Sequence, residues 1–141
     1  MQSTTKATKS PKGTTTMEHS GLICVREVKS KGRGVFASCA IKKGTIIERV
    51  PVVLVPIEDL VGGLTNPTLN KYFYHWDKKH IAVSLGYGSL YNHSFEPNAR
   101  YIHGVKTLTY RALCDIDEGE EITINYNFKP DDHTPMAFLV R

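Results

Sequence analysis

Apolar and polar positions alternate in short runs along the chain. The longest unbroken apolar stretch, residues 50–57, has eight residues and contains two prolines. Period-two alternation with many Val, Ile, Thr and Tyr residues predicts β-strands, and turn residues separate the runs. The expected strands are residues 22–28, 34–37, 45–50, 52–55, 81–85, 99–103, 105–113 and 122–126. The pattern therefore predicts a single mostly-β domain of many short strands.

Three places in this pattern are less regular. Pro51 separates two apolar runs and predicts a sheet edge or a break in the strand, because proline has no backbone N–H for the ladder. Residues 58–61 are expected to form a single helical turn before two glycines. Residues 70–76 are rich in aromatic side chains, and their pattern is compatible with either helix or strand.

The N-terminal segment differs from the rest in composition. Residues 1–17 are mainly Thr, Ser, Lys and Gly, so we expect a disordered basic tail followed by a folded domain at residues 18–141. The tail holds three of the 18 basic residues and no acid, which leaves 15 basic and 14 acidic residues elsewhere. A solvated leader is the favoured reading of the tail, and weak nucleic-acid contact is the alternative. With neither an apolar leader nor a span of about 20 apolar residues, we expect no membrane contact and a location in the cytoplasm or nucleus.

Cysteine and histidine usage gives little support for a metal site. Cys24, Cys39 and Cys114 are odd in number and lack C-x-x-C spacing, so we expect small buried thiols rather than disulfides or zinc ligands. His75, His80 and residues 131–133 show no helical metal-binding spacing and are interpreted as surface residues. The prediction for metals is therefore none.

Three segments carry the candidate chemistry. Residues 31–37 place two glycines around one arginine, which allows close backbone approach to a ligand, although alone this is more typical of a plain turn. Residues 86–99 set Asn-His-Ser and Pro-Asn among apolar residues. His93 there is compatible with a base, a ligand or a packed imidazole, and the packed imidazole is favoured. Residues 118–128 lead a charged turn into a strand that ends at Tyr126, which alone indicates only a core or rim position.

Together, G-R-G-V-F-A, N-H-S-x-x-P-N and G-E-E-I-T-I-N-Y resemble, in this order, the motifs of the SET-domain lysine methyltransferases. The resemblance spans about residues 22–128, and the absence of a large insertion is similar to minimal viral or bacterial members. It implies several small β-sheets and a C-terminal segment threaded under a loop as a pseudoknot. It also implies S-adenosylmethionine on one face, with the target lysine entering from the other through a narrow channel.

The resemblance also implies roles for individual residues. The backbone around residues 32–34 is expected to hold the methionine end of the cofactor, the Asn92 side chain and the His93 backbone to bind it, and Tyr126 to lie beside the transferring methyl group as the catalytic residue. The cofactor-binding residues are expected to be Gly32, Arg33, Gly34, Asn92, His93 and Tyr126. Aromatic candidates for the channel wall are Tyr72, Tyr74, Tyr87, Tyr91, Tyr101 and Phe128, of which Tyr72, Tyr87, Tyr101 and Phe128 are assigned to the lysine channel.

The chemistry implied by the resemblance agrees with these residue types. A lysine amine must be neutral to attack a methyl group, and at a pKa of about 10.4 only roughly one lysine in a thousand is neutral near pH 7.4. An apolar aromatic channel disfavours the ammonium, so desolvation, alignment and oxygen dipoles can replace a strong general base. Glu or His acting as that base is the less favoured hypothesis.

Several questions stay open at this level. Ile124 stands where many relatives carry Phe or Tyr, so the number of methyl groups transferred is not predicted. No cysteine follows Cys114, which indicates a short C-terminal segment without the zinc site of many nuclear relatives. A histone tail or another basic protein is the expected substrate, and a homodimer is a possible assembly. The alternative function is a catalytically inactive protein-binding module.

Overall fold

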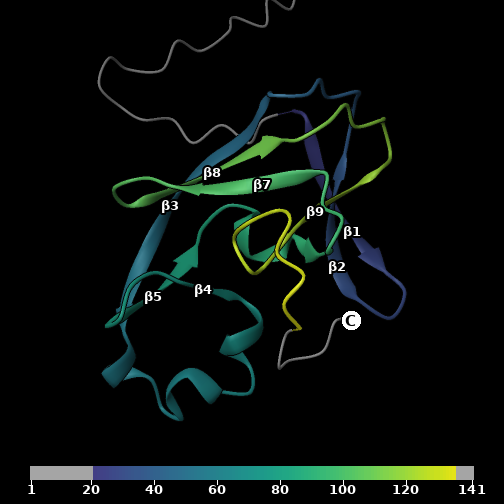
Figure 1. Cartoon of the computed structure of the whole chain (residues 1–141). Helices are drawn as coiled ribbons and strands as arrows, with labels where there is room; N and C mark the ends of the chain where they lie inside the picture. The colour runs from purple at the N-terminus through teal and green to yellow at the C-terminus, as the bar shows by residue number, and fades with distance from the viewer. Residues whose placement is uncertain (1–20, 136–141) are drawn as a thin grey trace, which may run out of the picture.

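The computed structural model describes residues 21–135, so the predicted tail at residues 1–17 lies outside the described part (Figure 1). The strands are β1 (Ile23–Val28), β2 (Gly32–Ala37), β3 (Ile46–Pro56), β4 (Phe73–His75), β5 (His80–Ser84), β6 (Asn92–His93), β7 (Ala99–His103), β8 (Thr107–Ala112) and β9 (Glu121–Ile124). The short 3₁₀ turns are η1 (Ile57–Asp59), η2 (Gly63–Thr65), η3 (Leu69–Lys71) and η4 (Gly88–Leu90).

The strands form two sheets, which confirms the mostly-β prediction. One sheet has the order β1-β2-β9-β6, and the other has the order β4-β5-β3-β8-β7. Apolar side chains from both sheets meet in one core cluster, in which Val35, Ile47, Leu108, Ile122 and Ile124 are completely buried. The alternation predicted from the sequence thus places one face of each sheet in a shared interior.

Both predictions for Pro51, a break and a sheet edge, are wrong. β3 runs through Pro51 as a strand of 11 residues and lies in the middle of the five-stranded sheet. The first part of β3 pairs with β8 up to Pro51, and the second part pairs with β5 from Val52 onward. Proline is therefore placed where the strand changes partners. Its carbonyl oxygen still accepts a hydrogen bond from the Leu85 N–H at 3.1 Å. A missing donor costs little at such a position, since no continuous ladder runs through it.

The C-terminal strand β9 lies between β2 and β6, antiparallel to the first and parallel to the second. The segment that follows β6 closes over β9 through Asn98. The Asn98 amide donates to the Glu121 carbonyl oxygen at 2.8 Å, and its oxygen accepts the Thr123 N–H at 2.9 Å. One side chain thus supplies both a donor and an acceptor to a strand. These two hydrogen bonds hold the segment after β6 against β9.

The structure also bears on the predictions for residues 70–76 and for the cysteines. Residues 70–76 divide into the end of η3 and the strand β4, so both readings of this segment were partly correct. All three cysteines are free thiols, but the expectation of burial is wrong. Cys24 and Cys39 are only half-buried, and Cys114, which follows the end of β8, is exposed. Between residues 21 and 135, no helix is long and apolar enough for a membrane span. In the same range, no three His, Cys, Asp or Glu side chains are grouped for a metal ion.

Candidate active site

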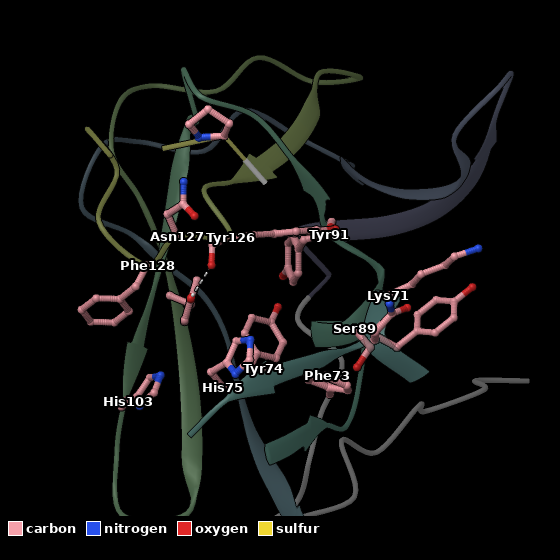
Figure 2. A pocket seen from close by; sticks show the side chains of 14 residues that line it. Lys71, Phe73, Tyr74, His75, Ser89, Tyr91, His103, Tyr126, Asn127 and Phe128 are labelled. Atoms are coloured by element: carbon pink, nitrogen blue, oxygen red, sulfur yellow. Dashed lines mark hydrogen bonds between the residues drawn. The ribbon is translucent and has the colours of Figure 1, made fainter. Parts of the chain in front are cut away.

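Two cavities lie side by side and share a wall. The larger cavity, about 590 Å³, is lined mainly by aromatic side chains from β4, β7 and the segment after β9 (Figure 2). The smaller cavity, about 160 Å³, is lined by Gly32, Arg33 and Asn92 among other residues. The residues that line both cavities are Lys71, Tyr72, Ser89, Tyr91 and Tyr126. Two compartments of different character therefore meet at Tyr126.

The smaller cavity is organised around Asn92, a buried side chain on β6. Its Nδ2 donates to the Arg33 carbonyl oxygen at 3.1 Å and to Glu121 Oε1 at 2.7 Å. Both amide hydrogens are thereby used, and the carboxamide oxygen is left as an acceptor for a ligand. A Cβ atom at Gly34 would lie 2.7 Å from Glu121 Oε1 and 3.0 Å from Asn92 Nδ2, so a larger residue there must shift these side chains.

Tyr126 is fixed at both its backbone and its side chain. It lies two residues past the end of β9, and its N–H donates to His93 Nδ1 at 3.0 Å. Its hydroxyl donates to the Tyr91 carbonyl oxygen at 2.6 Å, and its own carbonyl oxygen accepts the Tyr101 hydroxyl at 3.3 Å. Because the hydroxyl hydrogen is directed to Tyr91, the lone pairs of the phenolic oxygen face other directions.

The larger cavity is an aromatic chamber. The Tyr74 and Tyr101 rings meet edge to face with centroids 4.8 Å apart, although β4 and β7 are opposite edges of the five-stranded sheet. Phe128 lies edge-on to Tyr101 at 5.4 Å and to His103 at 5.3 Å. The φ angle of Phe128 is 77°, in the left-handed region that non-glycine residues rarely adopt. Its N–H donates to the Asn125 carbonyl oxygen at 3.1 Å, which helps hold this turn.

Burial in this region disfavours charge. Desolvation raises the pKa of the Tyr74, Tyr91 and Tyr101 hydroxyls, so these groups stay protonated. Desolvation also lowers the pKa of the His93 and His103 imidazoles, which favours their neutral forms. Acids and bases thus shift in the directions that leave each uncharged. Desolvation is the largest cause throughout, and for Tyr91 the nearby Glu48 carboxylate raises the pKa further. An amine that enters the chamber meets the same penalty on its charged form.

The structure brings most of the predicted residues to the two cavities. Those that line at least one cavity are Gly32, Arg33, Tyr72, Asn92, Tyr101, Tyr126 and Phe128. Gly34 lies directly behind Asn92, and His93 contacts Tyr126 rather than either cavity. Tyr87 packs against the hydrophobic core and lines neither cavity, so the structure does not place it with the others.

Some cavity residues were not predicted from the sequence. Lys71 and Ser89 line both cavities, and His103 lines the larger one. His103 lies two residues after Tyr101 on β7, so period-two alternation places it on the same face and was the signal available. Lys71 ends the short 3₁₀ turn η3 just before Tyr72, and so short a turn has no periodic pattern from which to predict where a side chain points. Tyr74 and Tyr91, from the wider set of aromatic candidates, also line the larger cavity.

Comparison with known proteins agrees with this geometry. The profile of the SET domain family matches residues 32–127. A Schizosaccharomyces pombe protein, "Histone-lysine N-methyltransferase, H3 lysine-37 specific", is 34% identical over 104 residues, which is 72% of this chain and 71% of that protein. A crystal structure of a candidate histone methyltransferase from Plasmodium falciparum has a TM-score of 0.63 at 34% identity and covers 74% of this chain and 91% of its own. The chain therefore belongs to the SET-domain family of protein-lysine methyltransferases.

Proposed function

We propose that the protein transfers methyl groups from S-adenosylmethionine to the ε-amine of a lysine in a histone tail or another basic protein. The observation that carries this proposal is the pair of cavities that meet at Tyr126, one polar and one aromatic. A donor and an acceptor can approach Tyr126 from opposite sides of this shared wall. The histone as acceptor rests on the names of the two relatives, which are both described as acting on histones.

The residues of the smaller cavity fit the cofactor. The free oxygen of Asn92 is an acceptor for an ammonium group, and the backbone at Gly32 and Arg33 lines the same space. Gly34 keeps a close approach open, since a Cβ there would displace Asn92. When bound, the cofactor supplies an electrophilic methyl group on a sulfonium. The chain would bind and orient the donor with the Asn92 carboxamide and nearby backbone, beside the charged residues Glu27, Arg33 and Lys71, which suits a ligand of mixed charge.

The aromatic chamber supplies the conditions for the lysine amine. The burial that shifts the pKa of the surrounding tyrosines and histidines also disfavours an ammonium ion, so the proton is lost to solvent before transfer. A bound cofactor would offer its methyl carbon to this neutral nitrogen, with the carbon–sulfur bond breaking to release a neutral thioether. The Tyr126 oxygen, held by its hydrogen bond to Tyr91, would supply an oxygen dipole at the shared wall of the two cavities, where the methyl group would pass. Alignment and desolvation thus provide the catalysis, without a strong base.

The proposal is tested with the full chain, methyl-labelled cofactor, core histones and a panel of lysine peptides. We expect label on a lysine side chain, located by mass spectrometry, together with cofactor binding measured by calorimetry. Binding without transfer to any acceptor across the panel would favour the binding module instead. Absence of both binding and transfer would reject the cofactor assignment as well.

Replacing Gly34 with alanine is expected to raise the Kd for the cofactor by about tenfold or more. The added Cβ overlaps Glu121 Oε1 and presses on Asn92 Nδ2, and overpacking of this kind costs about 1–3 kcal/mol. Calorimetry with S-adenosylmethionine measures the change. The matched control is Gly21→Ala, because a Cβ at Gly21 meets nothing within 4 Å. An unchanged Kd in Gly34→Ala would remove Asn92 from the proposed cofactor site.

A further inference from the structure

The parallel pairing between β6 and β9 ends at Ile124, two residues before Tyr126. The last paired residues are His93 and Ile124, and the Ser94 N–H donates to the Ile124 carbonyl oxygen at 2.9 Å. Beyond this point the Tyr126 N–H donates to a side chain, His93 Nδ1, at 3.0 Å. An imidazole thus takes the place of a backbone acceptor at the residue that lies between the two cavities.

This hydrogen bond fixes the protonation state of His93. A nitrogen that accepts from a backbone N–H carries no hydrogen, so the imidazole is neutral and its proton resides on Nε2. Protonation would put a second donor at Nδ1, facing the Tyr126 N–H, and the bond would be lost. The Nε2 atom is buried without a hydrogen-bond partner among residues 21–135, and burial lowers the pKa of His93. Both observations favour the neutral ring.

The surroundings of His93 are aromatic. Its ring lies 5.1 Å from the Tyr126 ring and edge-on to Phe95 at 4.5 Å. Within residues 21–135, the titratable groups in ring contact with His93 or Phe95 are the Tyr126 phenol and, stacked on Phe95 at 5.8 Å, the His133 imidazole. Desolvation by these apolar neighbours lowers the pKa of His93, so the packing of the ring favours its neutral form.

We infer that the His93 side chain is a positioning residue for Tyr126, and that gaining a proton at Nδ1 releases Tyr126 and stops methyl transfer. This inference rests on the proposed function and assigns it a pH switch. The neutral ring is the competent form, so transfer is present above the pKa of His93 and is lost as the pH falls through it. Since that pKa is lowered from 6.5, the loss occurs below about pH 6.5.

The hydrogen bond can be tested without activity, by NMR on ¹⁵N-labelled full-length protein. At neutral pH we expect a scalar coupling across the N–H···N bond from Tyr126 to His93 Nδ1, with the ring proton on Nε2. On acidification the coupling disappears, and the Tyr126 amide shifts in step with the His93 titration. A proton on Nδ1 at neutral pH, or a Tyr126 amide that ignores the titration, overturns the inference even if no methyl acceptor is ever found.

Two isosteric variants then test the effect on transfer. In His93→Asn the side-chain oxygen occupies the position of Nδ1 and does not titrate, whereas in His93→Gln the polar atoms occupy the position of Nε2. Both keep the backbone, so each is expected to bind S-adenosylmethionine with a Kd within about threefold of wild type. The kcat of His93→Gln is expected to fall about 30-fold or more, since a small displacement of an aligned group is costly. His93→Asn is expected to retain roughly a third or more of the kcat.

The pH profile separates positioning from a structural role. We expect the ratio of wild-type to His93→Asn kcat to fall below about pH 6.5 and to be level above it. Burial also lowers the pKa of His103 in the larger cavity, so His103→Asn serves as the control and is expected to keep the acid loss. Equal kcat for the Asn and Gln variants, or a ratio of wild-type to His93→Asn kcat that stays level below about pH 6.5, contradicts the inference. Absence of transfer in wild type contradicts the proposed function and leaves the NMR result to decide the hydrogen bond.

Discussion

Phenylalanine in place of Tyr126 is expected to lower kcat by about 100-fold or more, while the cofactor Kd changes by less than about threefold. Removing the hydroxyl deletes the oxygen that the hydrogen bond to the Tyr91 carbonyl aims between the two cavities. Loss of one preorganised polar group at a reacting centre typically costs about 10²–10³ in rate. The ring remains, so its contacts in the aromatic chamber are kept and the donor side is unaffected.

Label transfer under saturating cofactor and acceptor measures this kcat, and calorimetry measures the Kd. Tyr87→Phe is the matched control, because Tyr87 packs against the core and lines neither cavity, and it is expected to retain the wild-type kcat. Full activity in Tyr126→Phe would reject the catalytic role of Tyr126. A large loss in Tyr87→Phe would restore Tyr87 to the lysine channel, as first predicted from the sequence.

Replacing Gly88 with alanine is expected to lower the free energy of unfolding by about 3 kcal/mol. A Cβ at Gly88 would overlap Ser84 Oγ and lie 2.5 Å from the Tyr110 hydroxyl. These groups belong to a buried chain of hydrogen bonds, in which Tyr110 donates to the Tyr74 hydroxyl at 3.0 Å and Tyr74 donates to the Gly88 carbonyl oxygen at 2.6 Å. Relief of the overlap must therefore break bonds between buried polar groups, which adds to the cost.

Urea denaturation followed by fluorescence measures this loss. Gly21→Ala is again the control, with an expected change within about 0.5 kcal/mol, since nothing lies within 4 Å of its Cβ position. Because Tyr74 lines the larger cavity, we also expect Gly88→Ala to reduce methyl transfer in the fraction that stays folded. A variant as stable as Gly21→Ala would show that the network around Gly88 can relax without loss.

Local pattern predicted the strands well where a strand has a regular partner. β7 has the predicted bounds, whereas β9 ends at Ile124 and not at the predicted Tyr126. The reason is that the Tyr126 N–H bonds to the His93 side chain, and an interaction across 33 residues leaves no mark on local periodicity. The two-residue strand β6 is too short for any pattern, and the change of partners at Pro51 depends on two strands far along the chain.

Only the part of the candidate site that lies within the three sequence motifs could be predicted. The motifs contain Gly32, Asn92 and Tyr126, and these residues meet at the smaller cavity. The larger cavity depends on how the five-stranded sheet curls, which local sequence patterns do not reveal. Lys71 and His103 were therefore missed, and Tyr87, predicted for the lysine channel, packs against the core. The sequence does not distinguish a tyrosine in the core from a tyrosine in a cavity, because the two differ only in which residues pack against them.

The two cavities have separate origins in the architecture. The smaller one is built on β2 and β6 of the four-stranded sheet, and the larger one forms where the opposite margins of the other sheet meet through Tyr74 and Tyr101. Substitutions on β4 or β7 can therefore reshape the acceptor side while the donor side keeps its form. The selectivity for new target proteins can thus be redesigned, or can evolve, without changes to the residues that bind the methyl donor.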